Sequence, residues 1–338
     1  MELHPAKYWN TTDDGERVQC KLCPQNCKIG DGKRGICGVR INKGGVLLSE
    51  AYAEVISLTM DPIEKKPLYH FFPGEAILST GPRGCNLRCD FCQNWTISQM
   101  DGPTSTVTPK QLVSLALREN SIGIAYTYTE PTIAFEYVMD CSQLAREKGL
   151  FNVMVTNGFI NPEPLEDLLE VVSAFNIDLK AMDDEFYQKI CSGRLQPVMD
   201  TIAAIAKSKA LVEVTNLIIP GYNDSAEKIV ELVDFIASLD PSIPLHFSGY
   251  YPAHRFQAPP TEVKHLRAAY EIAIEKLSYV YVGNRRTDWG NDTHCPNCGN
   301  LLVSRSGFNG HIEGIADSGR CNNCGRPTDV IGRWTSED

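Results

Sequence analysis

The sequence contains no apolar run that approaches the ~20 residues needed to cross a bilayer. Its first residues, MELHPAKYWN, lack the basic stretch followed by an apolar stretch that marks a signal peptide. It also has no long internal repeat, no low-complexity segment and no block of like charges. These absences predict a cytoplasmic protein that does not insert into a membrane.

Positive charge is scarce, because 32 lysines and arginines face 42 aspartates and glutamates, for a net charge of −10. Such a chain is poorly suited to nonspecific binding of DNA, RNA or an anionic membrane surface. A local basic groove is compatible with that total, so the charge counts against a nucleic-acid partner without ruling one out. With 338 residues, 43% of them hydrophobic, the chain is long enough for a substantial core and small appended modules.

Cysteine, by contrast, is abundant. The chain has 13, which in a reducing compartment indicates metal binding more than disulfides. Only Cys141, expected in the core, and Cys191 stand alone. The others form three groups, which are Cys20, Cys23, Cys27 and Cys37, then Cys85, Cys89 and Cys92, and finally Cys295, Cys298, Cys321 and Cys324.

Between the outer groups, short apolar runs alternate with longer segments of helical periodicity. The predicted strands are 76–80, 123–128, 151–156, 175–180, 212–218 and 244–249, with a short closing strand at 277–283. The predicted helices are 109–119, 132–147, 163–174, 197–208, 225–238 and 261–276. Six successive strand–helix units predict parallel strands joined by right-handed crossovers, either closed as a (β/α) barrel or open as a doubly wound sheet. Both arrangements place functional residues at the carboxyl ends of the strands.

The segment GCNLRCDFCQNW, residues 84–95, has three cysteines at the spacing C-x3-C-x2-C. It follows the first predicted strand and therefore lies at the mouth of the predicted barrel. A closed structural site takes four protein ligands, so three thiolates on one tight loop favour an iron–sulfur cluster with one iron open to an exogenous ligand. The alternative is a zinc site that recruits a distant fourth ligand. Phe91, just before the last cysteine, could form an apolar wall for a bound ring.

The two outer cysteine groups differ in pattern. The C-terminal group consists of two C-x2-C pairs, each followed by glycine, which is typical of a zinc ribbon; iron is the alternative metal. The N-terminal group has the irregular spacing C-x2-C-x3-C-x9-C, and either zinc or an auxiliary 4Fe–4S cluster fits it. The predicted units are therefore a metal-binding segment at 1–50, a barrel at 51–288 and a zinc-ribbon-like module at 289–338.

The pattern C-x3-C-x-aromatic-C after the first strand of a (β/α) series resembles the signature of radical S-adenosylmethionine (SAM) enzymes. The chain resembles the pyruvate formate-lyase activating enzyme group more closely, and within it is similar to the radical SAM component of the AmmeMemoRadiSam system. The supporting segments run along the whole chain and are CKLCPQNC, KRGICGVR, DPIEKKPLYHF, GCNLRCDFCQNW, YTYTEP, TNGF, DLK, GRLQPV, IPGYND and CPNCG.

This resemblance implies a partial (β/α)6, TIM-like barrel that binds a 4Fe–4S cluster through Cys85, Cys89 and Cys92, with SAM on the open iron. One electron, supplied by a low-potential donor, cleaves SAM to methionine and a 5′-deoxyadenosyl radical, which removes a hydrogen atom from the substrate. Such an oxidoreductase is expected to work anaerobically. The activating-enzyme likeness suggests a glycine of a partner protein as substrate. Radical modification of a small molecule or an RNA is the alternative, and a noncatalytic iron–sulfur electron carrier is a more remote one.

The resemblance also implies which residues surround SAM. Glu130 is expected to accept hydrogen bonds from the SAM ammonium. Lys180 is expected to pair with the SAM carboxylate, and Asp178 to hold Lys180 or a monovalent cation. His246 is expected beside the adenosyl group, or else as a core histidine. The full set comprises Phe91, Thr129, Glu130, Thr156, Asn157, Asp178, Lys180 and His246.

Substrate contacts are less constrained by the sequence. Cys191 could donate a hydrogen atom to a substrate radical or be a buried, inert thiol. Aromatic and basic residues near strand ends could ring the mouth, although packing would account for the aromatic ones equally well. These residues are Tyr126, Tyr128, Tyr250, Tyr251, His254 and Arg255. The sequence leaves open the substrate, the electron donor, the oligomeric state and whether SAM is consumed or regenerated.

Overall fold

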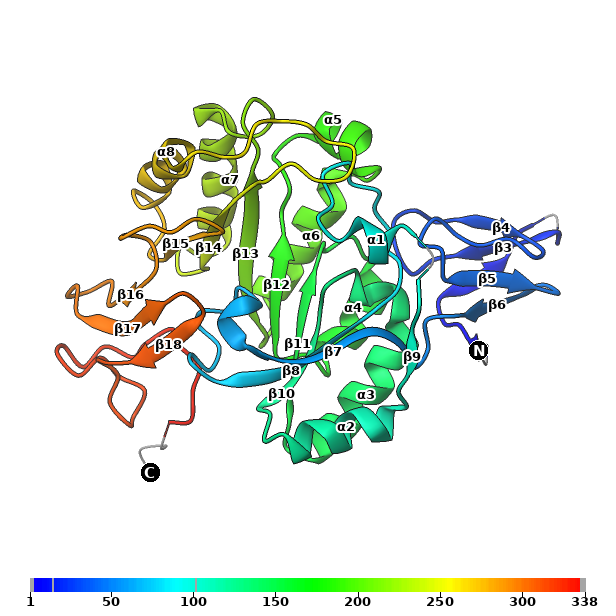
Figure 1. The fold of residues 1–338 in the computed structure, drawn as a ribbon, viewed down its shortest axis with the longest axis horizontal. Coiled ribbons are helices and arrows are strands. Elements are labelled where there is room, and N and C mark those ends of the chain that lie inside the picture. The colour runs from blue at the N-terminus through cyan, green and yellow to red at the C-terminus, as the bar shows by residue number, and fades with distance from the viewer. Residues whose placement is uncertain (1–2, 14, 101, 335–338) are drawn as a thin grey trace.

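The computed structural model describes residues 3–13, 15–100 and 102–334. At its centre, seven strands pair in parallel and curve into a partial barrel, with the principal helices along its outer side (Figure 1). In sheet order the strands are β8 (Ala76–Pro82), β10 (Gly123–Tyr126), β11 (Phe151–Thr156), β12 (Ala174–Asp178), β13 (Leu211–Ile218), β14 (Leu245–Gly249) and β15 (Val280–Gly283). The predicted α/β fold with a central parallel sheet is thereby confirmed.

The helices that cover this sheet agree with most of the predicted ones. They are α2 (Pro109–Arg118), α3 (Phe135–Glu147), α4 (Pro162–Leu169), α6 (Leu195–Ala206), α7 (Ala226–Leu239) and α8 (Val263–Ala273). Thr108 begins α2 with a capping box, since its side chain accepts from the Gln111 amide while the Gln111 side chain accepts from the Thr108 amide. Ser225 caps α7 through the Lys228 amide.

Two predicted helices differ from the structure. The helix predicted at 163–174 ends at Leu169, because the β-branched pair Val171 and Val172 turns into the core before β12 begins. The helix predicted from residue 132 starts instead with a 3₁₀ turn, η2 (Pro131–Ala134), which precedes α3. The strands predicted to 128 and 180 end earlier, at Tyr126 and Asp178, so several predicted site residues lie in the loops beyond the strands.

Two strands of the central sheet were absent from the prediction. β7 (Glu54–Pro62) pairs antiparallel with β8, and the short β9 (Ser105–Thr106) pairs antiparallel with β7. β7 is followed by the 3₁₀ turn η1 (Ile63–Lys65). Its middle residues are partly or largely exposed, so the segment lacks the continuous apolar run by which the other strands were recognised.

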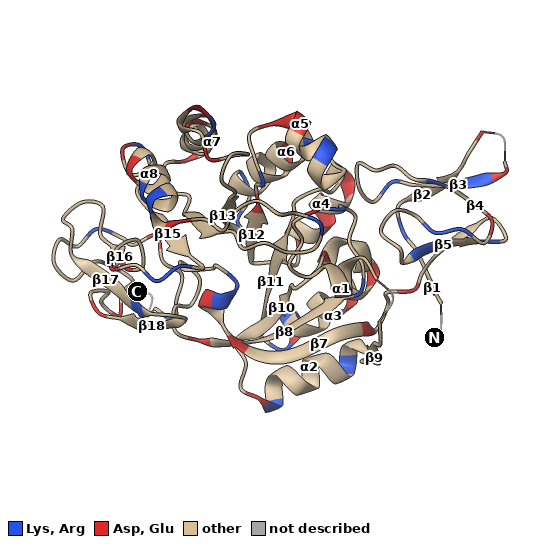
Figure 2. Ribbon diagram, turned by 45° about the horizontal axis from the view of Figure 1, so that its top comes forward, with Lys and Arg blue, Asp and Glu red and all other residues tan. Residues whose placement is uncertain are grey.

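The terminal modules lie at opposite ends of the long axis of the molecule (Figure 1). The N-terminal module has two three-stranded sheets, formed by β1 (His4–Pro5), β6 (Val46–Ser49) and β5 (Arg40–Lys43), and by β2 (Trp9–Thr11), β3 (Arg17–Cys20) and β4 (Lys28–Gly30). The C-terminal module is the sheet of β16 (Thr293–His294), β17 (Leu301–Ser306) and β18 (Asn309–Ile312). Residues of both charge signs are spread over these modules and the outer helices (Figure 2). The exact unit boundaries stay a prediction.

The segment after β7 fills the amino-terminal end of the barrel. The backbone amides of Tyr69 and His70 donate to the buried Glu213 carboxylate at 3.0 and 2.8 Å. His246 contacts the same carboxylate at 2.6 Å. Asn176 donates to the Pro67 carbonyl at 2.8 Å. Tyr69, His70, Asn176, Glu213 and His246 are all buried, so this segment plugs the amino-terminal end of the barrel.

Candidate active site

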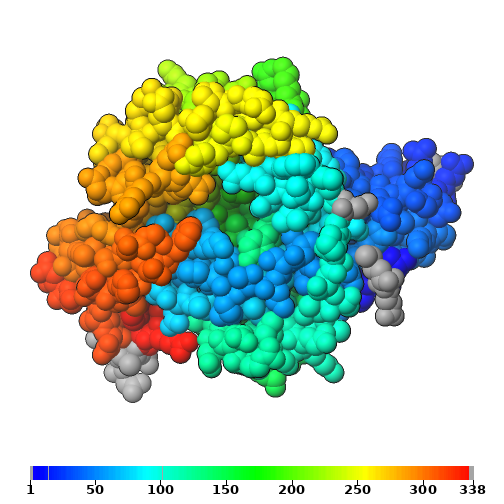
Figure 3. Space-filling model, viewed as in Figure 1, coloured from blue at the N-terminus to red at the C-terminus, as the bar shows by residue number. Residues whose placement is uncertain are grey.

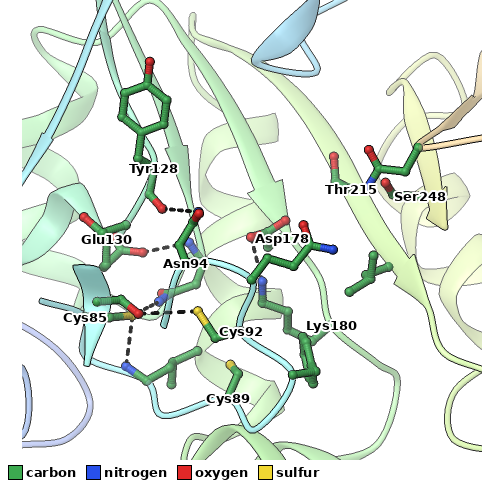
Figure 4. Close-up of a pocket in the computed structure, with 18 residues that line it drawn as sticks. Cys85, Cys89, Cys92, Asn94, Tyr128, Glu130, Asp178, Lys180, Thr215 and Ser248 are labelled. Carbon is green, nitrogen blue, oxygen red and sulfur yellow. Dashed lines mark hydrogen bonds and ion pairs between the residues drawn. The ribbon is translucent and has the colours of Figure 1, made fainter. Parts of the chain in front are cut away.

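A cavity of about 250 Å³ opens at the carboxyl ends of the parallel strands. In Figure 3 green residues are visible at the bottom of a hollow bordered by cyan and blue residues on one side and yellow and orange residues on the other. Most of the residues predicted to bind the cluster and SAM line this cavity. They are Cys85, Cys89, Phe91, Cys92, Thr129, Glu130, Asn157, Asp178 and Lys180 (Figure 4).

The cysteine loop is held by backbone contacts to a π-helical turn, Tyr187–Cys191. The Arg88 amide donates to the Cys191 carbonyl at 2.9 Å, and the Asp90 amide donates to the Ile190 carbonyl at 3.0 Å. Such π turns often occur at functional sites. The loop is thereby fixed in place on the barrel before any ligand binds its thiols.

The donor set of this loop fits an iron–sulfur cluster better than a single zinc ion. Asn157 lies 3.6 Å from the Cys85 Sγ, and the Cys92 Sγ lies 3.4 Å from the Ser98 hydroxyl. Zinc would gather its ligand atoms around one point, whereas each thiolate of a cluster binds a different iron. Among the described residues, the three sulfurs are not part of any set of ligand atoms that all lie within 4.8 Å of one another. Burial raises the pKa of the Cys85 and Cys92 thiols.

Glu130 ties the ends of two neighbouring strands together. Its Oε1 accepts from the Thr132 amide at 3.0 Å and the Thr156 hydroxyl at 2.7 Å, and its Oε2 accepts from the Asn157 amide at 2.9 Å. Burial raises the pKa of this carboxyl, and the three donors oppose that rise. Thr156 does not itself line the cavity but orients Glu130, whose Oε2 retains room for a second donor.

Tyr128 and Thr129 precede Glu130 and line the cavity with it. Tyr128 has a left-handed backbone with φ of 70°, which a non-glycine residue adopts at a cost of roughly 1–2 kcal/mol. Its hydroxyl donates to Asp61 at 2.6 Å, and its ring lies 4.7 Å from the Lys66 Nζ. The Asn94 side chain donates to the Tyr128 carbonyl at 2.6 Å. Side-chain and backbone contacts therefore hold the conformation that glycine would adopt freely.

Asp178 and Lys180 form the predicted ion pair, with 2.6 Å between Oδ2 and Nζ. Burial lowers the lysine pKa, but the carboxylate outweighs that effect, so the pKa of Lys180 is raised and its ammonium stays charged. The Lys180 amide donates to the Tyr187 hydroxyl oxygen at 2.9 Å, and Asn223 donates to its carbonyl at 2.7 Å. A fixed cation thus faces the cavity across from Glu130 (Figure 4).

His246 does not line the cavity. Asp178, Thr215 and Ser248 do line it. His246 lies two residues before Ser248 on β14, in register with Thr215 of β13, and contacts the buried Glu213. Its surroundings are those of a core histidine, and its expected place beside an adenosyl group stays a prediction.

The suggested substrate contacts are also divided by the structure. Tyr128 lines the cavity, whereas Tyr126 is buried against Ser142 and Asn152, and the buried Tyr250 hydroxyl donates to Phe256. Tyr251 lies in a neighbouring hollow, His254 stacks on Trp95, and the Arg255 amide donates to the Asp90 carbonyl. Cys191 is fully buried outside the cavity lining, where its hydrogen bond with Cys89 raises the pKa of the Cys89 thiol.

Several lining residues were missed by sequence reasoning. Thr215 and Ser248 are polar residues near the carboxyl ends of otherwise apolar strands, and that position could have singled them out. Asn94 and Asn284 come from loops and Ser98 ends the short helix α1 (Trp95–Ser98), and no periodicity indicates that these segments fold over the cavity.

The C-terminal cysteines come together as predicted for one metal ion. Cys295 and Cys324 have their sulfurs 3.7 Å apart, as do Cys298 and Cys321, and all four lie within 4.8 Å of one another. Thiolates 2.3 Å from a tetrahedral zinc are about 3.8 Å apart. The N-terminal cysteines surround a separate small cavity.

Comparison with known proteins shows the family to which the chain is similar. The family described as the Radical SAM superfamily matches residues 80–236, which run from β8 into α7. The chain is 44% identical to the uncharacterized protein MJ0808 of Methanocaldococcus jannaschii, over 97% of this chain and 100% of that protein. It is 26% identical to pyruvate formate-lyase 1-activating enzyme of Escherichia coli, over 45% of this chain and 65% of that enzyme.

The fold is similar to that of a radical SAM methyltransferase from Sphaerobacter thermophilus, with a TM-score of 0.52 and 16% identity over 88% of this chain and 81% of that one. Within the described residues, no helix has both the length and the apolar character needed to span a membrane.

Proposed function

Because the chain belongs to the radical SAM superfamily, we propose that it binds a 4Fe–4S cluster through Cys85, Cys89 and Cys92, binds SAM in the adjoining cavity, and removes a hydrogen atom from a substrate. When bound and reduced, the cluster would supply one electron to the sulfonium of SAM, whose carbon–sulfur bond would break to give methionine and a 5′-deoxyadenosyl radical. The observation that carries this proposal is one cavity in which three thiols, a fixed cation and a buried carboxylate converge.

The residues of the chain have distinct tasks in this proposal. Lys180 binds the SAM carboxylate, and Asp178 keeps the ammonium pointed into the cavity. Glu130 accepts from the SAM amino group through the remaining lone pair of Oε2. Phe91 and Leu217 supply apolar walls that exclude water from the reacting atoms.

For the substrate, the activating-enzyme likeness supports a glycine of a partner protein, with a low-potential donor supplying the electron. A cavity of about 250 Å³ beneath surface loops admits an extended peptide more readily than a folded surface. The partner is therefore expected to present its glycine on a loop or a chain end.

The test is anaerobic reconstitution with iron, sulfide, dithionite and SAM, followed by measurement of 5′-deoxyadenosine. We expect the wild type to form it and the Cys89→Ser variant to form none. Protein from cells grown on deuterated glycine should transfer deuterium into the product if the substrate is a glycine residue. A triplet that binds only zinc, or a cluster whose spectrum is unchanged by SAM, would refute the proposal.

A second candidate substrate is an anionic small molecule or an RNA, and a specific observation favours it. A hollow of about 820 Å³ beside the C-terminal module is lined by Arg285, Arg286 and Arg305, and Asn284 lines both this hollow and the cluster cavity. Arg305 is already committed to backbone and hydroxyl acceptors, and Arg285 packs on the Tyr251 ring at 4.1 Å. Arg286 is exposed and is the arginine best placed to meet a ligand.

This alternative predicts which cell fraction transfers deuterium to 5′-deoxyadenosine and which substitution weakens substrate binding. Small molecules or RNA from deuterated cells, in place of protein, would then transfer deuterium into 5′-deoxyadenosine, and Arg286→Glu would weaken their binding. If only the protein fraction transfers label and Arg286→Glu has no effect, the arginine-lined hollow is not a substrate site.

A further inference from the structure

The N-terminal cysteines converge on one small cavity that is lined mainly by thiols and apolar side chains. Cys20 ends β3, Cys23 and Cys27 lie in the turn between β3 and β4, and Cys37 lies in the turn before β5. Cys20, Cys23 and Cys37 are buried, Cys27 is partly buried, and all are free thiols. Four thiols gathered away from water in so small a module indicate a metal site.

The spacing of these sulfurs differs from that of the C-terminal group. The C-terminal sulfurs all lie within 4.8 Å of one another, as ligands of one tetrahedral ion must. Across the part of the chain that the structure describes, no three of the N-terminal sulfurs meet that condition, although all four surround one cavity. The Cys85–Cys92 triplet does not meet it either. Neither the N-terminal quartet nor the triplet therefore has the close spacing of the zinc-ribbon-like site.

Arg40 gives an independent indication of a bound, negatively charged group. Its side chain is 2% exposed and lines the cavity of the quartet. One Nη atom is satisfied by Glu136 at 2.8 Å and by the Lys7 carbonyl at 2.6 Å. Its Nε and Nη1 atoms are buried without an acceptor. Buried N–H donors are rarely left without partners, and sulfur atoms of an anionic thiolate cluster would accept from them.

The quartet is in direct contact with the loop that carries the triplet. Gly84, the residue before Cys85, packs so closely on the Cys37 carbonyl oxygen that a Cβ at this position would lie 2.5 Å from it. Arg88 donates to the Ile36 carbonyl, and the Gln25 side chain donates to the Asn86 carbonyl at 2.9 Å. The backbone of Cys37, in the quartet, is therefore in direct contact with Gly84, which precedes Cys85 of the triplet.

From these observations we propose that Cys20, Cys23, Cys27 and Cys37 bind a second 4Fe–4S cluster, which passes electrons to the cluster on the Cys85–Cys92 loop. The transfer step rests on the function proposed above. One electron from a low-potential, one-electron protein donor reduces the N-terminal cluster, which returns to its oxidised form as the barrel cluster is reduced. No proton moves and no bond is made or broken in this transfer.

The test of the cluster itself is the metal content of protein purified anaerobically from iron-supplemented cells. We expect about eight irons and eight sulfides per chain, four of each in each cluster, with one zinc. Cys23→Ser/Cys27→Ser should retain about four irons. Cys85→Ser/Cys89→Ser/Cys92→Ser should also retain about four, in a cluster whose electron paramagnetic resonance spectrum is indifferent to SAM.

The matched control is Cys298→Ser/Cys324→Ser, which should lose zinc and keep about eight irons. The triplet variant decides the matter even if the quartet variant does not fold, because four irons with four sulfides can then reside only at the quartet, whereas the C-terminal cysteines are spaced for one ion. A triplet variant that contains zinc at both outer sites and no iron would overturn the proposal. None of these readouts depends on SAM cleavage, so a failed cluster assignment is distinguishable from a failed function.

The transfer step is tested separately by the choice of reductant. With Cys23→Ser/Cys27→Ser, formation of 5′-deoxyadenosine driven by a protein donor should fall at least tenfold. Formation driven by a small reduced viologen, which can reach the barrel cavity directly, should change by less than threefold. Equal losses with both reductants would show that the quartet supports the structure of the loop and carries no electrons.

Discussion

Lys180 and Glu130 illustrate how single residues of the cavity are oriented before any cofactor binds. The Lys180 ammonium is held by Asp178, and the Glu130 carboxylate is held by two backbone amides and one hydroxyl. Each group therefore faces the cavity in a fixed position, which lowers the entropic cost of binding a zwitterionic ligand.

Lys180→Met should weaken SAM binding without changing the iron content. A charge-assisted hydrogen bond contributes about 1.5–3 kcal/mol, so we expect the dissociation constant of SAM to rise about 10- to 150-fold. Calorimetric titration of the reconstituted protein measures it. Lys189→Met is the matched control, because Lys189 pairs with Glu185 on the surface and should leave the constant unchanged. If both variants bind SAM like the wild type, Lys180 does not contact the ligand.

His70 should make the protein less stable in mild acid. Its Nδ1 faces the Asp329 carbonyl at 3.0 Å, and its Nε2 faces the Tyr281 hydroxyl at 2.7 Å. Burial lowers the pKa of His70 to about 4. Because the unfolded chain binds this proton near pH 6.5, stability is fully present above that pH and falls as the pH drops toward 4.

The expected loss between about pH 7.5 and about pH 5 is about 2 kcal/mol in the free energy of unfolding. Urea unfolding at the two pH values measures it. The His70→Asn variant should be less stable at neutral pH and should lose about 2 kcal/mol less on acidification. An identical pH dependence in both proteins would show that His70 is not the group responsible.

At the scale of elements, β7 matters because it pairs with β8 beside the parallel strands and carries Asp61, which contacts Tyr128 of the cavity. Asp61, near its end, contacts Lys65 at 2.8 Å, Lys66 at 2.6 Å and the Tyr128 hydroxyl at 2.6 Å. Lys66 is 1% exposed, whereas the Lys65 side chain is 45% exposed. One carboxylate thus compensates a buried charge and also supports the strained residue beside Glu130.

Asp61→Asn should destabilise the protein by about 3–5 kcal/mol, because it leaves the Lys66 ammonium buried without a counter-charge. Lys65→Ala removes a partner of the same carboxylate at the surface and should cost less than about 1 kcal/mol. Chemical unfolding at neutral pH compares the two. Equal effects would mean that Lys66 loses its proton or reaches water in the variant.

The sequence was informative about elements that have one dominant physical signal. Parallel strands buried on both faces appear as continuous apolar runs, and helices begin at residues such as Thr108 and Ser225, so both could be recognised. β7 could not, because its middle residues are partly or largely exposed and its pairing is antiparallel.

The same contrast applies to the site. Cys85, Cys89 and Cys92 are adjacent in the sequence and could be grouped from it. The place of His246 below the cavity depends on a partner, Glu213, that lies 33 positions away. No local pattern reports such a contact.

At the scale of the whole molecule, the C-terminal module is joined to the barrel by buried polar contacts. The Arg305 guanidinium stacks on the Tyr69 ring at 4.2 Å and donates to the Tyr69 carbonyl at 2.6 Å. Tyr279 of the segment before β15 donates to Asp329 at 2.6 Å. A metal ion at the four cysteines would therefore stabilise the module and, through it, the closing strand of the sheet.

Cys298→Ser should release this metal and loosen the module. We expect loss of one zinc per chain, a melting temperature lower by several degrees, and early proteolytic cleavage within residues 289–334. Cys141→Ala, which changes a buried core thiol, should retain the zinc and the protease resistance of the tail. Metal analysis and mass spectrometry of the fragments measure both. A variant that keeps its zinc would show that the pairs do not share one ion.

The placement of the two cysteine modules at opposite ends of the long axis has a kinetic consequence. If the reductant docks beside the N-terminal module, as proposed, and the substrate enters at the mouth of the barrel, the two do not compete for the same surface. Neither has to leave before the other arrives, so turnover should proceed through a ternary assembly. Initial rates measured against both concentrations should then give intersecting, and not parallel, double-reciprocal lines.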